Sequence, residues 1–191
     1  MHISDGIIST ELSVVALAVS GGLIYMSTRN TSQEEIPRMG IIAAALFAVS
    51  TIHIPLAGTS VHPGLYGLAG IILGRRSVPV IFTALIFQSL IFQHGGLLSL
   101  GVNTLNMSAG AFAAWKIWEL KKISVLARAG LAGFLGVTLP AVLMAGEFML
   151  SGYGTEIAYF FSVYLLTGLM EAVLTLSSVK FLLKVKPEVI A

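Results

Sequence analysis

Long apolar stretches follow one another along almost the whole of this chain, and they constrain its fold more than any other feature. They lie near residues 12–28, 39–57, 60–74, 78–93, 97–118, 126–146 and 157–183. A helix needs about 20 predominantly apolar residues to cross a hydrocarbon core about 30 Å thick. The mean hydropathy of +0.92 and the charged fraction of 10% lie outside the range of soluble globular domains. The sequence therefore predicts an all-α membrane bundle of about seven transmembrane helices.

The third apolar stretch is shorter than the others and contains four glycines, Gly64, Gly67, Gly70 and Gly74. Such a segment predicts a tightly packed or partly broken helix that lines a cavity. The sequence shows no internal repeat, linker or low-complexity tract. We therefore expect a single integral membrane domain over residues 1–191.

Lysine and arginine occur only at alternate connections between the apolar stretches, including the adjoining stretch ends, and at the C-terminal end of the last stretch. They form four groups, within residues 29–38, 75–76, 116–128 and 180–186. By the positive-inside rule these connections face the cytoplasm, which places the N-terminus outside and the C-terminus inside and requires an odd number of crossings. The net charge of +2 follows from this topology and does not indicate a nucleic-acid partner.

All four histidines fall in the opposite set of connections or at the outer ends of helices. His2, His53, His62 and His94 are far apart in sequence, but the predicted topology places them on one side of the membrane. A single histidine near a membrane interface is usually a hydrogen-bonded or snorkelling side chain. Four on one side suggest a shared site. Because the chain has no cysteine, histidine, carboxylate and backbone atoms are the ligands it can offer a metal ion.

The N-terminal segment, residues 1–11, carries a potential chelate. The α-amine of Met1, the amide nitrogen of His2 and its imidazole Nδ1 can close fused rings around one ion. A planar nitrogen set completed by another imidazole suits Ni²⁺ or Cu²⁺ better than Zn²⁺, Mg²⁺ or Ca²⁺. Because the amine and amide must lose protons, affinity should fall with pH and residues added before Met1 should destroy the site. The segment lacks the basic start of a signal peptide, so we expect it to stay uncleaved.

Three motifs occur together in this chain. They are Met-His-Ile-Ser-Asp-Gly at residues 1–6, Gly-Thr-Ser-Val-His-Pro at 58–63, and Phe-Gln-His-Gly-Gly-Leu at 92–97, which leads into residues 100–107. The set resembles the CbiM/NikM family, the substrate-binding S components of energy-coupling-factor importers for nickel and cobalt. The resemblance spans nearly the whole chain. It implies a multi-pass subunit in the cell (inner) membrane of a bacterium or archaeon.

The resemblance also implies the ligands of the transported ion. Met1 would supply its amine, His2 its amide and imidazole nitrogens, and His62 the fourth equatorial nitrogen. The residues that would surround and orient these ligands, or the N-terminal segment that covers them, are Asp5, Gln93, His94 and Asn103. Asp5 could cap the first turn of a helix or hydrogen-bond a ligand imidazole. Nickel and cobalt are both candidates, and the planar geometry favours nickel.

Three further residues have more than one interpretation. We expect His53 to be an interfacial side chain rather than a ligand. Glu171 lies within the last apolar stretch, where a carboxylate is a functional candidate, although we favour a hydrogen bond between helices. Members of the family often have a histidine seven residues before this glutamate. Here that position is Tyr164, which removes the basis for an accessory role there.

The sequence contains no Gly-x-x-x-x-Gly-Lys-[Ser/Thr] loop for ATP phosphates. The resemblance implies that ATP is hydrolysed by two cytoplasmic ATPase subunits, joined by a transmembrane coupling (T) subunit and often by a small accessory membrane subunit. An autonomous secondary cation transporter or channel is the main alternative, and it would need ionisable residues near the bilayer midplane. An intramembrane metalloenzyme would need a general base, such as that of a His-Glu-x-x-His helix, which is missing. We therefore expect neither catalytic residues nor a catalytic cofactor.

Overall fold

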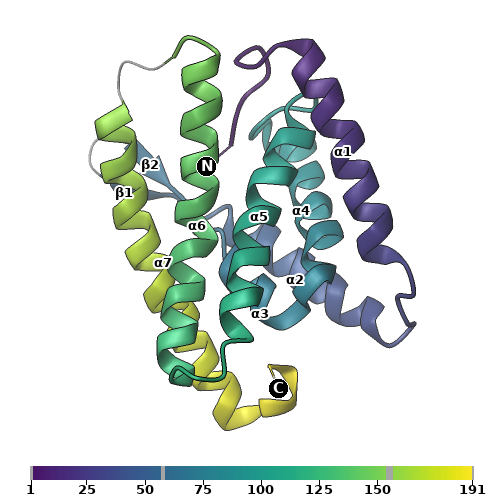
Figure 1. The fold of residues 1–191 in the computed structure, drawn as a ribbon, viewed down its shortest axis with the longest axis vertical. Coiled ribbons are helices and arrows are strands. Elements are labelled where there is room, and N and C mark those ends of the chain that lie inside the picture. Colours follow the sequence, from purple (N-terminus) through teal and green to yellow (C-terminus); the bar gives the residue numbers. More distant parts are fainter. Residues whose placement is uncertain (1, 57–58, 154–156, 191) are drawn as a thin grey trace.

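The structure, a computed structural model, describes residues 2–56, 59–153 and 157–190 (Figure 1). Its helices pack side by side into a bundle, with one short hairpin between α2 and α3. The elements run in the order α1 (Thr10–Thr28), α2 (Glu35–Val49), β1 (Ile54–Leu56), β2 (Thr59–Val61), α3 (Tyr66–Leu73), η1 (Gly74–Arg76), α4 (Ser77–Phe92), α5 (Leu100–Trp118), α6 (Val125–Leu150), α7 (Ile157–Val185) and η2 (Pro187–Val189).

The helices follow the predicted apolar stretches closely except between residues 50 and 74. There α2 ends at Val49 and the chain continues as an extended hairpin, and α3 has only 8 residues. At 1.5 Å per residue, α3 is about 12 Å long and cannot cross a bilayer alone. In the described part of the chain, four helical segments are long and apolar enough to do so, Thr10–Thr28, Tyr66–Phe92, Val125–Leu150 and Ala158–Val185. Seven crossings and the side of each terminus stay predictions.

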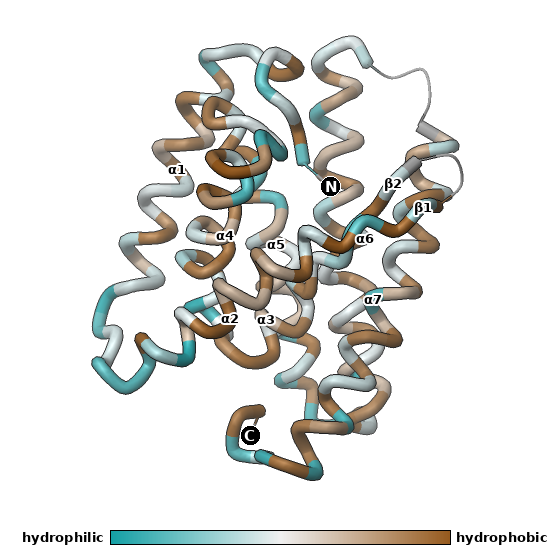
Figure 2. Tube along the Cα trace, turned by 180° about the vertical axis from the view of Figure 1, so that it is seen from behind, coloured by the Kyte–Doolittle hydropathy of each residue, from teal (hydrophilic) through white to brown (hydrophobic). Residues whose placement is uncertain are grey.

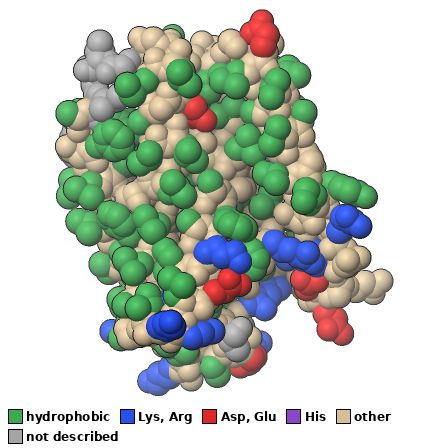
Figure 3. Space-filling view, viewed as in Figure 1, with side chains coloured by type: hydrophobic (Ala, Val, Ile, Leu, Met, Phe, Trp, Pro, Cys, Tyr) green, Lys and Arg blue, Asp and Glu red, His purple; other side chains and the backbone are tan. Residues whose placement is uncertain are grey.

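The surface of the bundle is apolar, as a membrane protein requires. Large hydrophobic side chains point outward from α1 and α7, including Val14, Val15, Tyr25 and Val173. Figure 2 shows hydrophobic residues along the helices and hydrophilic ones in the connection between α1 and α2. On the face drawn in Figure 3, lysine and arginine gather at the lower end, where Figure 1 places the C-terminus. This arrangement matches the grouping of basic residues on which the predicted topology depends.

Helix α5 occupies the middle of the bundle, where it packs against α1, α3, α4 and α6. Small buried residues such as Ala111 and Ala114 let the neighbouring helices approach it closely. Ser20 of α1 donates its hydroxyl to the carbonyl oxygen of Gly101, at 2.8 Å. Asn106 of α5 donates to Glu147 of α6, with 2.7 Å between Nδ2 and Oε2. These contacts make α5 a fixed support for the segments that cross its N-terminal end.

Glu171 of α7 holds the extended segment that joins the hairpin to α3. Its side chain is fully buried and accepts hydrogen bonds from the backbone N–H groups of Gly64 and Leu65, the latter at 3.1 Å. Leu65 has a left-handed conformation, φ 51°, and precedes the first turn of α3. The expected bond between two helices is therefore wrong, because the carboxylate bonds to the connection that carries His62.

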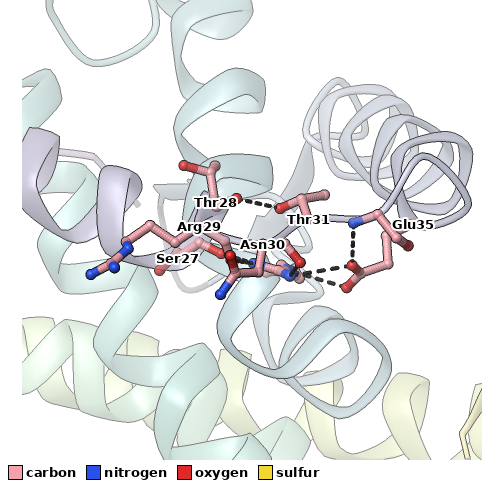
Figure 4. Close-up of polar contacts among 8 residues, drawn as sticks. Ser27, Thr28, Arg29, Asn30, Thr31 and Glu35 are labelled. Carbon is pink, nitrogen blue, oxygen red and sulfur yellow. Dashed lines mark hydrogen bonds and ion pairs between the residues drawn. The ribbon is translucent and has the colours of Figure 1, made fainter.

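A buried arginine organises the opposite end of the bundle. Arg76 donates to the carbonyl oxygens of Ser27, Arg29 and Asn30, the last at 2.8 Å, and pairs with Glu35 at 2.9 Å between Nε and Oε1. Figure 4 shows how tightly the connection between α1 and α2 is folded at this point. One guanidinium thus fixes the end of α1, the start of α2 and the turn η1.

Candidate metal site

The N-terminal segment is tied to α5 by a pair of hydrogen bonds. Asn103 accepts from the N–H of Ile3 at Oδ1, at 2.8 Å, and donates from Nδ2 to the carbonyl oxygen of Ile3, at 2.9 Å. The Ile3 side chain is fully buried in an apolar cluster with Ile8, Val102 and Met144. Because Ile3 is fixed in both backbone and side chain, the position of its neighbour His2 is fixed as well.

Asp5 makes a second attachment to the start of α5. Its Oδ1 accepts from the backbone N–H of Ser99 at 2.8 Å and from the Ser99 hydroxyl at 2.9 Å. Burial alone would raise the pKa of Asp5, but the hydrogen bonds, chiefly from Ser99, outweigh it and lower the pKa. Asp5 therefore ties the N-terminal segment to the residue that precedes α5, whereas the side chain that caps the first turn of α1 is Ser9.

Two glycines allow the connection between α4 and α5 to touch the N-terminal segment. Gly95 has φ +81°, and a Cβ there would lie 3.3 Å from the Cβ of His2. A Cβ at Gly96 would lie 1.9 Å from Oδ1 of Asp5, so no larger residue fits without a shift. The Gly-Gly pair of the third motif therefore brings His94 against the N-terminal segment.

Three imidazoles meet at this point, from three segments that are far apart in sequence. The rings of His2 and His62 are nearly parallel, with centroids 5.2 Å apart and an angle of 14°. The ring of His94 stands almost perpendicular to both, at 4.6 Å from His2 and 4.9 Å from His62. One ring nitrogen of each lies within 4.8 Å of the other two. A metal ion with bonds of about 2.0–2.1 Å would hold such nitrogens up to about 4 Å apart, so small adjustments suffice.

The electrostatics of the cluster favour a neutral, metal-binding form. Burial lowers the pKa of His62 to about 3 and that of His94 to about 4, and the neighbouring imidazoles add to the effect. Burial also lowers the pKa of His2 well below its usual value. Both ring nitrogens of His2 are buried and have no hydrogen-bond partner among the described residues. Because buried polar groups are normally paired, this ring is well suited to bind a ligand that the protein alone does not supply.

A small cavity of about 20 Å³ lies beside His62. It is lined by the hairpin, α3, α6 and α7, and Tyr164 and Thr167 are among its lining residues. Such a volume holds about one water molecule. Tyr164 is thus close to His62 without offering an imidazole.

Three other residues singled out from the sequence are Met1, Gln93 and His53. Met1 lies outside the described residues. Gln93 is exposed and ends α4 in a left-handed conformation, φ 53°, with its backbone N–H donating to Gln88. His53 is exposed as expected, but its ring lies 6.2 Å from that of His62 and 6.0 Å from that of His94. In the sequence, the placement of all four histidines on one side of the membrane was the feature that indicated a position for His53 near the other three.

The pair of hydrogen bonds between Asn103 and Ile3 leads to a prediction for metal affinity. Replacing Asn103 with alanine should weaken Ni²⁺ or Co²⁺ binding by about tenfold to a hundredfold, because residues that orient metal ligands typically contribute that much. Isothermal titration of the purified protein would measure the change. Asn106→Ala is the matched control, since Asn106 lies one turn further along α5 and bonds to Glu147 instead. Equal losses of metal affinity in both variants would show that the hydrogen bonds between Asn103 and Ile3 have no specific role.

The Glu171 contact leads to a prediction for stability. Glu171→Leu should lower the free energy of unfolding by about 1–3 kcal/mol, because it leaves buried N–H groups at Gly64 and Leu65 unpaired. It should also weaken metal binding, since the freed segment carries His62. Thermal unfolding in detergent and metal titration would test both effects. Glu171→Gln retains a carbonyl acceptor and should lose less, so an equal loss in both variants would contradict this account.

Comparisons with known proteins point to one kind of transporter. Residues 2–189 match a family described as "CbiM: Cobalt uptake substrate-specific transmembrane region". A cobalt transport protein CbiM of Sorangium cellulosum is 32% identical over 213 aligned positions, which cover 100% of this chain and 94% of the relative. A putative fused nickel transport protein NikMN of Archaeoglobus fulgidus is 31% identical over 203 positions, covering 100% of this chain and 68% of the relative.

Solved structures with the same fold have also been described as metal transporters. The crystal structure of a transition metal transporter superposes with a TM-score of 0.86 at 26% identity, covering 97% of this chain and 93% of that one. A truncated transition metal transporter gives a TM-score of 0.85, also at 26% identity, and covers 96% and 99% of the two chains. The fold of the bundle is therefore that of a membrane metal transporter.

Proposed function

Because this chain belongs to the CbiM family of cobalt and nickel transport membrane proteins, we propose that it is the substrate-binding subunit of an ATP-driven importer of the energy-coupling-factor type. The observation that carries this proposal is the convergence of His2, His62 and His94, with both buried ring nitrogens of His2 unpaired among the described residues. A neutral, preformed group of imidazoles suits reversible binding of a borderline divalent cation.

The transported ion binds through the N-terminus and two histidines in this proposal. Met1 gives its amine, His2 its amide and imidazole nitrogens, and His62 the fourth nitrogen of the plane. The hydrogen bonds of Asn103 and Asp5 support it, because they hold the N-terminal segment over the cluster. His94 stands nearly perpendicular to the other two rings and closes the site from a third direction. The planar set favours Ni²⁺, while an additional nitrogen from His94 would suit Co²⁺.

Energy for uphill transport comes from partner subunits in this proposal. The chain would act with a transmembrane coupling subunit, two cytoplasmic ATPases and a small accessory membrane subunit, in the inner membrane of a bacterium or archaeon. Its N-terminal segment, residues 1–11, would face the outside as part of a single membrane domain. The basic residues at the opposite end of the bundle support this orientation (Figure 3).

Uptake of radioactive Ni²⁺ or Co²⁺ by cells tests the assembly. Cells that produce this chain with its coupling subunit and ATPases should accumulate the metal, and cells that produce the chain alone should not. A Walker-lysine substitution in the ATPases is the control for energy coupling. Full accumulation by the chain alone would support the alternative of an autonomous cation carrier and would rule out the partnered mechanism.

A further inference from the structure

His53 is the only described histidine that lies outside the three-imidazole cluster, yet its ring faces two members of it. We propose that His53 and His94 form an outer docking position, where an incoming Ni²⁺ or Co²⁺ ion binds before it passes to His2 and His62. This inference rests on the proposed function, because it assigns a route to the ion that the inner site would bind. It also gives His53 a role in binding, in place of the interfacial role expected from sequence.

The hairpin sets the position of His53 relative to His62. The antiparallel register pairs Ile54 of β1 with Val61 of β2, so His53 and His62 follow at the same end of the hairpin. Their ring centroids are 6.2 Å apart. The pairing of β1 with β2 thus brings an exposed histidine next to a buried one, although the two lie nine positions apart in sequence.

Exposure falls in steps from His53 to the inner cluster. His53 is exposed, His94 is half-buried, and His62 is buried with 6% of its surface accessible. The His94 ring is 6.0 Å from that of His53 and 4.6 Å from that of His2. The histidines therefore form a series of decreasing exposure from the surface to the inner cluster, in which His53 keeps its Nε2 for an ion because its Nδ1 lies 3.0 Å from the carbonyl oxygen of Thr51.

His94 can belong to both positions, which allows transfer without release of the ion. Two imidazoles with metal bonds of about 2.0–2.1 Å span a centroid distance of about 6 Å when the ion lies between them. At the outer position, water would complete the coordination of the ion, so binding there would be weak. Moving inward, the ion would keep His94, lose water and His53, and gain the nitrogens of His2 and His62. The larger nitrogen set drives the ion inward.

A residue that an ion passes on its way to a site affects both the association and the dissociation rate but not the equilibrium. His53→Ala should therefore slow Ni²⁺ association and dissociation by the same factor, about tenfold, while the dissociation constant changes by less than about twofold. Stopped-flow mixing of the purified protein with Ni²⁺ and a metallochromic indicator measures the association rate, and chelator chase measures the dissociation rate. Ser60→Ala, an exposed change on β2, is the matched control and should alter neither rate.

The outcomes separate this inference from the proposed function. Unchanged rates in His53→Ala would overturn the docking position and leave the inner site intact. Faster dissociation with an unchanged association rate would make His53 a ligand of the inner site. That result would also overturn the outer docking position. If the docking position exists, His62→Ala should retain weak Ni²⁺ binding that the double variant His53→Ala/His62→Ala loses. Failure of the unaltered protein to bind Ni²⁺ or Co²⁺ at all would overturn both proposals.

Discussion

Protein with a few residues added before Met1 is expected to lose tight Ni²⁺ and Co²⁺ binding while it keeps its fold. The addition converts the terminal amine into a peptide amide and breaks the first chelate ring. It also adds chain close to His2, whose ring contacts those of His62 and His94. The affinity should fall by more than the roughly hundredfold effect typical of residues that only orient ligands.

Isothermal titration of three forms tests this expectation, namely protein with a native N-terminus, protein with the extension, and His62→Ala. Both altered forms should lose tight binding, because each lacks one of the four proposed nitrogens. Their thermal unfolding without metal should match that of the native form, since Asn103 and Asp5 still hold the N-terminal segment. Equal metal affinity in all three forms would place the binding site elsewhere in the molecule.

The positions of the long helices could be predicted from sequence because the bilayer imposes one simple rule. A spanning helix must satisfy its own backbone and present apolar side chains for its whole length. The stretch 126–146 accordingly corresponds to α6, and 78–93 to α4. The chain between residues 50 and 74 is also rich in apolar residues, but part of it is extended. Hydropathy could not reveal this, because the hydrogen bonds that support the extended part come from Glu171, over 100 residues away.

The candidate site could be predicted in part for a similar reason. The topology rule grouped the four histidines on one side, and the cluster formed by His2, His62 and His94 agrees with that grouping. The contacts that position them are long-range, such as the one between Ile3 and Asn103, and composition carries no sign of them. The place of His53 depends on the register of a hairpin with two strands of three residues each, which hydropathy does not encode. Sequence thus grouped the histidines on one side, and the structure supplied their arrangement.

Arg76→Ala is expected to be the most destabilising single change at the basic end of the bundle. The side chain is 7% exposed and its guanidinium donates to carbonyl oxygens of Ser27, Arg29 and Asn30. Hydrogen bonds from a charged donor contribute more than neutral ones, and carbonyls left buried without a donor add a penalty. The free energy of unfolding should fall by about 3 kcal/mol or more, measured by denaturation in detergent.

Two further variants identify which contact of Arg76 matters. Arg75→Ala removes the neighbouring, exposed guanidinium and should leave stability nearly unchanged. Glu35→Gln removes the ion pair but keeps the carbonyl contacts, so it should cost less than Arg76→Ala. The pKa of Glu35 is lowered to about 2, and the hydrogen bond from Arg76 is the main cause. A lowered pKa stabilises the folded state above the ordinary value of 4.5, and this contribution disappears as pH falls towards 2. If Glu35→Gln proved as damaging as Arg76→Ala, the ion pair rather than the three carbonyl contacts would hold α1 to α2.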